Sequence, residues 1–187
     1  MNRGRTEIVL FDFDEPRDVE EWEPINDTVM GGVSRSTLEA GGASTAVFAG
    51  TVSLENYGGF ASVRSAVRDY DLRRCSGIRV RVKGDGKTYK LSLRADAAFD
   101  GVAHQAGFAT QAETWIDVDL PFHDFVPSFH GRVLQDTPGV DPRRIRSFSL
   151  LIADKQEGPF RLEIDWIKAY CGGARKAAAK RSNHSAT

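Results

Sequence analysis

Apolar and polar residues alternate with the period of a β-strand along much of the chain. Residues 78–83 and 89–94 each alternate strictly, which places their apolar side chains on one face of a strand. The two runs flank Gly84-Asp85-Gly86, so we predict that they form a β-hairpin. The expected buried face consists of Ile78, Val80, Val82, Tyr89, Leu91 and Leu93, with Arg79, Arg81, Lys83, Lys90 and Arg94 on the opposite face.

Further strands are expected along the rest of the chain. Alternating runs cover residues 115–120 and 160–166, and more continuous apolar runs predict strands at 8–13, 46–52 and 148–153. About ten short strands separated by turns predict an all-β fold, an antiparallel β-sandwich or jelly roll, because alternating strand and helix units are missing from the pattern.

Helical signals are confined to two short segments. Pro16–Trp22 is expected to form two turns, and Asp141–Ile145 one turn, with Asp141 as the cap and Pro142 at the first position. We expect a single domain over residues 6–171, followed by a basic, disordered tail at 172–187.

Composition narrows the class of protein. The chain has 187 residues, and 25 Lys and Arg against 26 Asp and Glu give a net charge of −1, so a nucleic-acid partner is not expected. An apolar run of about 18 residues is missing, and residues 1–10 lack the pattern of a signal peptide, so we expect an intracellular protein without membrane insertion. Cys75 and Cys171 are expected to be two unpaired thiols.

Charge is unevenly distributed along the chain. Residues 12–27 hold eight acids and one arginine, whereas residues 64–94 hold ten bases and three acids. Such segments form solvated faces or neutralise each other across a fold, and the alternative is that they steer a charged partner.

Each catalytic motif that the sequence resembles is incomplete. Gly86-Lys87-Thr88 resembles the end of a phosphate-binding loop, but Arg81 stands where the first glycine belongs, so we expect a hairpin turn. Gly32-Val33-Ser34-Arg35-Ser36 lacks the second glycine of a nucleophile elbow. The spacing of the histidines does not match a metal site; they are His104, His123, His130 and His184. We therefore expect no catalytic residue, no metal and no cofactor.

Two pairs of carboxylates are the basis of the remaining enzymatic hypothesis, that the chain is a glycosidase. Asp117 and Asp119, and likewise Glu163 and Asp165, would lie on one face of a strand about 7 Å apart. That separation suits the paired acids of a glycosidase, but any alternating strand with acids on its polar face produces it. A solvated or salt-bridged face is the expected role.

Two glycine-rich segments, residues 22–34 and 48–64, contain the candidate binding residues. Polar side chains beside paired glycines suit a ligand-binding loop, but they equally suit a tightly folded buried corner. We predict that Arg64 and Asp27 form a bidentate ion pair between the two segments. The candidate residues are Asn26, Asp27, Met30, Gly31, Gly32, Ser34, Asn56, Gly58, Gly59 and Arg64.

These two segments resemble the complex I intermediate-associated protein family, whose mitochondrial members help assemble NADH:ubiquinone oxidoreductase. The resemblance continues at Val82–Lys90, Leu120–Phe122, Gly131-Arg132 and Gly158–Asp165, and it spans about Ile8–Tyr170. It implies a galactose-binding-like jelly roll related to carbohydrate-binding modules. It also implies a non-enzymatic, chaperone-like module with protein partners such as complex I subunits or assembly intermediates, and it supplies no catalytic residues.

A carbohydrate-binding module is the alternative function. Exposed aromatic rings could stack on a small sugar-like ligand, and Tyr57, Tyr89 and Trp115 are the candidates. The residues before Glu7 lack the Arg- and Ser-rich pattern of a mitochondrial presequence. We therefore expect a bacterial cytoplasmic location, with the mitochondrial matrix as the alternative.

Overall fold

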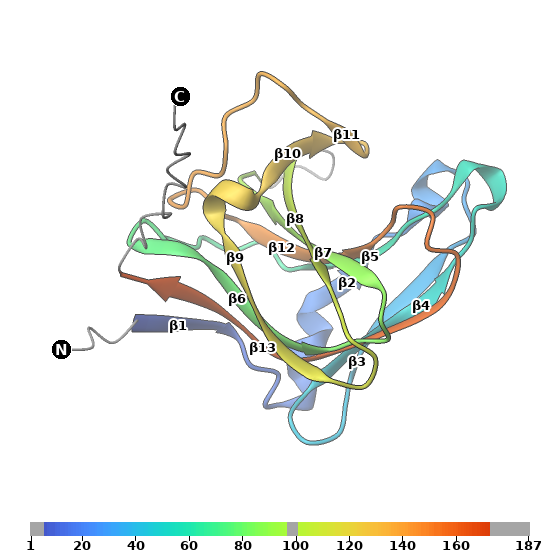
Figure 1. Cartoon of the computed structure of the whole chain (residues 1–187), viewed down its shortest axis with the longest axis horizontal. Helices are drawn as coiled ribbons and strands as arrows, with labels where there is room; N and C mark the ends of the chain where they lie inside the picture. The colour runs from blue at the N-terminus through green and yellow to red at the C-terminus, as the bar shows by residue number, and fades with distance from the viewer. Residues whose placement is uncertain (1–5, 97–100, 173–187) are drawn as a thin grey trace, which may run out of the picture.

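Two antiparallel β-sheets pack face to face in the computed structural model, which describes residues 6–96 and 101–172 (Figure 1). Sheet A has the strand order β3 (Arg35–Ala40), β4 (Ala46–Val52), β13 (Gly158–Cys171), β6 (Cys75–Lys83) and β9 (Trp115–Pro121), and β1 (Thr6–Phe11) also pairs with β13. Sheet B has the order β11 (Arg132–Val133), β10 (Val126–Phe129), β8 (Ala103–Ala109), β7 (Thr88–Arg94), β12 (Ser147–Ile152), β5 (Ala61–Ser65) and β2 (Trp22–Pro24). This architecture confirms the predicted all-β sandwich.

The core lies between the two sheets, as the alternation predicts. Ile78, Val80 and Val82 on β6 and Tyr89 and Leu91 on β7 are fully buried. The predicted hairpin between these strands is nevertheless wrong, because β6 pairs with β13 and β9 whereas β7 pairs with β12 and β8. The turn after Lys83 therefore carries the chain from one sheet to the other. Strands that face each other across a core bury their apolar sides in the same way as strands that pair.

Strand β13 organises sheet A. Its first half pairs with β4, from Gly158 opposite Val52 to Ile164 opposite Ala46. Its second half pairs on the same edge with β1, up to Cys171 opposite Thr6, while β6 occupies the other edge. One long strand thus holds three neighbours together.

Of the two expected helices, the second is replaced by a turn and the first is short. The first is a 3₁₀-helix, η1 (Pro16–Glu21), and further 3₁₀-turns are η2 (Asp27–Met30), η3 (Glu55–Tyr57) and η4 (Phe122–Asp124). The segment after Asp141 forms a turn in which the Arg143 N–H donates to the Asp141 carboxylate at 3.1 Å. Within the described residues, none of the helices is long and apolar enough to span a lipid bilayer. The predicted tail beyond Gly172 lies outside the described residues.

Cys75 and Cys171 form a disulfide, so the expectation of two unpaired thiols is wrong. The two cysteines lie opposite each other on the neighbouring strands β6 and β13, although 96 residues separate them in the sequence. Their spacing along the chain gives no sign of this contact, because it depends on the pairing of two distant strands.

Candidate binding site

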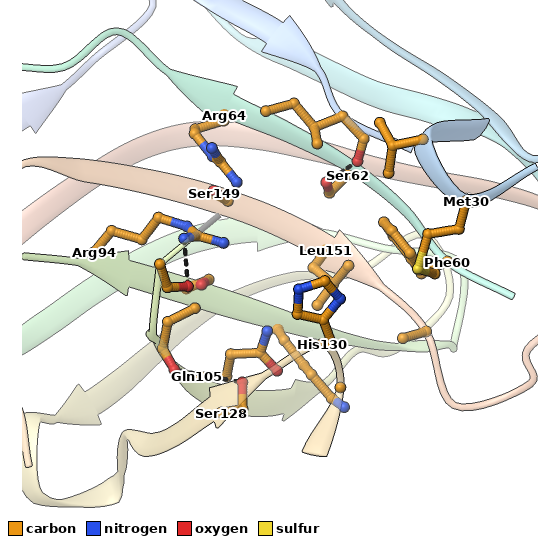
Figure 2. A pocket seen from close by; sticks show the side chains of 18 of the residues that line it. Met30, Phe60, Ser62, Arg64, Arg94, Gln105, Ser128, His130, Ser149 and Leu151 are labelled. Carbon is orange, nitrogen blue, oxygen red and sulfur yellow. Dashed lines mark hydrogen bonds between the residues drawn. The ribbon is translucent and has the colours of Figure 1, made fainter. Parts of the chain in front are cut away.

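A cavity of about 390 Å³ opens on the outer face of sheet B, the face turned away from the core (Figure 2). Strands β5, β7, β8, β10 and β12 supply its floor, and the first glycine-rich segment borders one end. Residues that line it include Met30, Phe60, Ser62, Arg64, Lys90, Ser92, Arg94, Gln105, Ser128, His130, Ser149 and Leu151.

Strand alternation explains why this floor is polar. On β7, Lys90, Ser92 and Arg94 face the cavity, because the residues between them, Leu91 and Leu93, are buried in the core. The other strands of the floor follow the same rule. The predicted polar face of residues 89–94 is therefore part of the floor of the cavity.

Pairing between strands aligns polar side chains into a row across the floor. Arg64 on β5 lies opposite Ser149 on β12, Ser149 lies opposite Ser92 on β7, and Ser92 lies opposite Gln105 on β8. The row brings a guanidinium, two hydroxyls and an amide to one surface, all able to donate hydrogen bonds to a ligand.

The carboxylate of Asp27 holds the two glycine-rich segments together. Asp27 is fully buried, and its Oδ1 accepts from the Ser34 N–H at 2.9 Å. Its Oδ2 accepts from the Ser34 hydroxyl at 2.5 Å, from the Gly59 N–H at 2.7 Å and from the Phe60 N–H at 3.3 Å. Because Ser34 lies in the first segment and Gly59 and Phe60 in the second, one side chain fixes both.

Asn26 forms a second link beside it. Its Oδ1 accepts from the Ser36 hydroxyl at 2.6 Å and from the Ser62 N–H at 3.1 Å. Ser62 begins the cavity-facing row of β5. The link therefore positions the β5 part of the cavity floor as well as the loop.

The paired glycines are required around Asp27 for two different reasons, a positive φ angle and a close approach to the carboxylate. Gly31 and Gly59 have φ angles of 88° and 134°, which favour glycine. Gly32 and Gly58 leave room for the carboxylate, because a Cβ on either residue would lie about 2.5 Å from an Asp27 oxygen. Each pair therefore combines one unusual backbone angle with one close approach.

The structure separates the ten predicted site residues into groups. Asn26, Asp27, Gly32 and Ser34, with Gly58 and Gly59, form the junction between the segments. Met30 and Arg64 line the cavity, whereas Gly31 and Asn56 are exposed.

The predicted pair between Arg64 and Asp27 is wrong. Among the described residues, the Asp27 carboxylate is bound by Ser34, Gly59 and Phe60, and Arg64 extends from β5 toward the cavity instead (Figure 2). Alternation along β5 put Arg64 on this face correctly, but the sequence does not show on which side of the sheet the Asp27 turn lies.

The two carboxylate pairs lie on the outer face of sheet A and take part in ion pairs. Asp117 binds Arg81 at 2.8 Å and Asp119 binds Arg79 at 2.5 Å, each directly opposite its partner on the neighbouring strand. Asp165 binds Arg81 at 3.1 Å. The basic run on β6 is thus neutralised by acids of β9 and β13.

Glu163 is the more enclosed member of the second pair. Burial alone would raise its pKa, but hydrogen bonds from Lys83 at 2.8 Å and from Thr45 at 3.0 Å hold the pKa below its ordinary value. Glu163 is therefore an ionised partner of Lys83, which is unlike the raised pKa of a general acid.

The three aromatic residues considered for sugar stacking lie in three different places. Tyr89 is fully buried, and its hydroxyl donates to Asp85 at 2.9 Å while burial raises its pKa. Trp115 lies on the outer face of sheet A, with the Lys83 ammonium 5.2 Å from its ring centre. Tyr57 is completely exposed at a loop tip. Among the described lining residues of the cavity, the aromatic rings belong to Phe60 and His130.

Most residues of the cavity floor were not predicted from the sequence. Ser92, Gln105, Ser128 and Ser149 have side chains typical of any solvent-facing strand position. Ser92 and Ser149 become neighbours only through the order of strands in sheet B, which local pattern does not predict.

The sequence of this chain matches a protein family and individual relatives. The family described as Complex I intermediate-associated protein 30 matches residues 11–164. The protein "Complex I intermediate-associated protein 30, mitochondrial" of Drosophila melanogaster is 31% identical over 88% of this chain, and its mouse counterpart is 28% identical over 87%. The chain spans 62% of the length of the fly protein and 56% of the mouse protein.

Solved structures share the fold. The family 11 carbohydrate-binding module of a Clostridium thermocellum cellulase superposes with a TM-score of 0.69, at 18% identity, over 90% of this chain and 96% of the module. The same kind of module in complex with a β-1,3-1,4-mixed-linked tetrasaccharide gives a TM-score of 0.65, at 19% identity, over 87% of this chain and 94% of that one. The predicted relation to carbohydrate-binding modules is confirmed at the level of the fold.

Proposed function

The chain belongs to the Complex I intermediate-associated protein 30 family, and we propose that it is a non-enzymatic binding module that associates with protein subunits or assembly intermediates of NADH:ubiquinone oxidoreductase. The names of the fly and mouse relatives support this association. The ion-paired state of the carboxylates on sheet A supports a role without catalysis.

The cavity on sheet B is the observation that carries the proposal. A hollow of about 390 Å³ with an aligned row of polar side chains is a surface on which a segment of a partner can be enclosed. We propose that Met30 and Arg64 contact the partner. Asn26, Asp27 and Ser34, together with the glycine pairs, then serve to hold Met30 and the second segment in position.

The cellular location is part of the same proposal. The mitochondrial names of the fly and mouse relatives favour a mitochondrial location, for which we propose the matrix, and the bacterial cytoplasm is the other expectation. Cell fractionation of the epitope-tagged protein in its native host distinguishes the two.

Affinity capture tests the proposal directly. The tagged full chain is recovered from its native host after mild detergent treatment, and co-purified proteins are identified by mass spectrometry. We expect complex I subunits with the wild type and a loss of them with Met30→Ser or Arg64→Gln, while Arg17→Gln, at an exposed site outside the cavity, retains them. Absence of complex I subunits, with normal complex I after deletion of the gene, would falsify the proposal.

A saccharide ligand is the second candidate function. The observation that favours it is the shared fold with a module solved in complex with a mixed-linked tetrasaccharide. The hydroxyls of Ser92 and Ser149 could bind sugar hydroxyls, but the ring faces that usually stack on sugars are limited to Phe60 and His130 in the described lining.

Calorimetry with that tetrasaccharide, together with a glycan array, tests this candidate. Binding at millimolar sugar that is lost in a Ser92→Ala and Ser149→Ala double variant would establish a saccharide site. Lack of binding to every glycan on the array would remove this candidate and leave the protein-partner proposal unaffected.

A further inference from the structure

The two ends of the cavity differ in chemistry. Arg64 and Arg94 extend into one end, whereas Met30 and Phe60 lie together at the other (Figure 2). Leu151 lies on the floor between them. A ligand that fills the cavity therefore meets cationic groups at one end and apolar groups at the other.

Strand register explains the position of the two arginines. Arg64 on β5 lies opposite Ser149, and Arg94 on β7 lies opposite Ser147, so the arginines flank β12 from both sides, two residues apart along it. The hydroxyl of Ser149 faces the cavity between them. Two guanidinium groups around a hydroxyl form a surface suited to a carboxylate.

The charge of the cavity supports the same ligand chemistry. Lys90 pairs with Asp154 at 2.8 Å and both line the cavity, so Arg64 and Arg94 give the described lining a formal net positive charge. Both arginines have other interaction partners, and Arg94 donates to the Gly101 carbonyl at 2.6 Å. Each guanidinium has five N–H donors, so a ligand carboxylate can share a group that is already held in place.

The apolar end is fixed in advance by the Asp27 junction. Phe60 donates its backbone N–H to Asp27, and Met30 ends the 3₁₀-turn that begins at Asp27. Met30 is nevertheless 55% exposed, so a partner can cover it. Fixing both residues before binding lowers the entropy cost of a contact there.

We propose that the cavity binds an acidic segment of a protein partner, with an Asp or Glu carboxylate between Arg64 and Arg94 and a neighbouring apolar side chain against Met30 and Phe60. This inference rests on the proposed function and specifies the chemistry of the partner. Charge complementarity favours the acidic group, and the exposed apolar end favours a peptide over a neutral sugar.

Selection from a phage-displayed library of random 12-residue peptides tests the inference, with the immobilised full chain as bait. We expect the enriched peptides to share an Asp or Glu close to a large apolar residue. In a synthetic version of one such peptide, Asp→Asn (or Glu→Gln) should weaken binding to the wild type at least about tenfold, the loss of one charged hydrogen-bond pair. This measurement needs no protein variant.

Variants of the chain then locate the contact. Arg64→Gln and Arg94→Gln should each weaken the acidic peptide about tenfold but not its amide counterpart, and Met30→Ser should weaken both peptides. Arg17→Gln is the matched control, an arginine replaced outside the cavity. Thermal melting of each variant shows whether it has folded.

Several results would overturn the inference. Enriched peptides without an acidic residue, or acidic peptides that bind Arg64→Gln as well as the wild type, would rule out the carboxylate contact. Binding of polygalacturonate, with no enriched peptide, would assign the cavity to an acidic glycan instead. In each of these cases, capture of complex I subunits by the full chain is a separate result, so failure of this inference is distinguishable from failure of the proposed function.

Discussion

Asp27 illustrates how one residue can decide whether a loop is a ligand site or a junction. All hydrogen-bond partners of its carboxylate are donors, three of them backbone N–H groups, in a place without access to water. An amide side chain would turn one of its two oxygens into a donor that faces other donors. The site therefore requires a carboxylate for structural reasons alone.

Replacement of Asp27 by asparagine should lower the free energy of unfolding by about 2–4 kcal/mol, because buried N–H groups lose their acceptor. Urea denaturation followed by circular dichroism measures the loss. Asp14→Asn, at an exposed position, is the control and should change stability by less than about 0.5 kcal/mol. An equal, small effect of both substitutions would show that the junction does not stabilise the fold.

Glu163 gives a prediction about pH. Its pKa is depressed in the folded state, so its contribution is fully present above the ordinary value of 4.5 and is lost as the pH falls through the lower folded value. Glu163→Gln should therefore cost about 1 kcal/mol at pH 7, discounted for partial exposure, and progressively less as the pH falls below 4.5. Urea denaturation at pH 7 and at a series of lower pH values tests this. A difference that does not change with pH would contradict the assignment.

At the scale of residues, the sequence identified the special positions but not their tasks. Asn26, Asp27 and the paired glycines stand out in any inspection of the chain, and all but the exposed Gly31 belong to one junction. Whether such residues bind a ligand or one another depends on which segment lies opposite. For the same reason, Ser92 and Gln105 could not be recognised before the strand order was known.

The local pattern predicted the positions of the strands well, but it did not predict which strands pair. The strand at 46–52 has the expected bounds, and the strand at 148–153 is shifted by one residue. The error at β6 and β7 arose because alternation reports which face is buried and not which strand lies beside it. In a sandwich, a tight connection can join strands within a sheet or carry the chain across the core.

The two glycine-rich segments form one structural unit around Asp27. A substitution at Gly32 tests how closely they pack there. Gly32→Ala should destabilise the fold by about 3 kcal/mol, because the new Cβ would lie 2.4 Å from the Asp27 carboxylate carbon. Gly42→Ala is the matched control, since a Cβ there meets nothing within 4 Å. The control should be neutral or stabilising by up to about 1 kcal/mol. Thermal and urea unfolding measure both, and equal stability of the two variants would contradict the close approach.

At the scale of the whole molecule, the disulfide joins strand β6 to the end of β13. Cys75→Ser should lower stability by about 4 kcal/mol in oxidising buffer, because the link closes a loop of 96 residues in the unfolded chain. A reducing agent should lower the stability of the wild type by a similar amount and leave Cys75→Ser unchanged. Intact mass under both conditions checks the bond, and identical masses with identical stabilities would contradict it.

The overall class of the fold was predictable because strand periodicity is a local property that repeats along the chain. The disulfide, the order of strands and the cavity were not, because each depends on contacts between distant residues. Cys75 with Cys171 and Arg64 with Ser149 are examples, and in each pair the partners become neighbours through strand pairing alone.

Strand β13 also bears on how the chain acquires its structure during synthesis. The first described strand, β1, pairs with β13 and with no other described strand, and β13 is the last strand described. On the ribosome, neighbouring strands such as β3 with β4 and β7 with β8 can pair early, because their contacts are short in sequence. Sheet A cannot be completed before Gly158–Cys171 is synthesised, because this strand pairs with residues as distant in sequence as Thr6. Until it emerges, β4 and β6 of the nascent chain each present an open edge, and open strand edges are templates for aggregation.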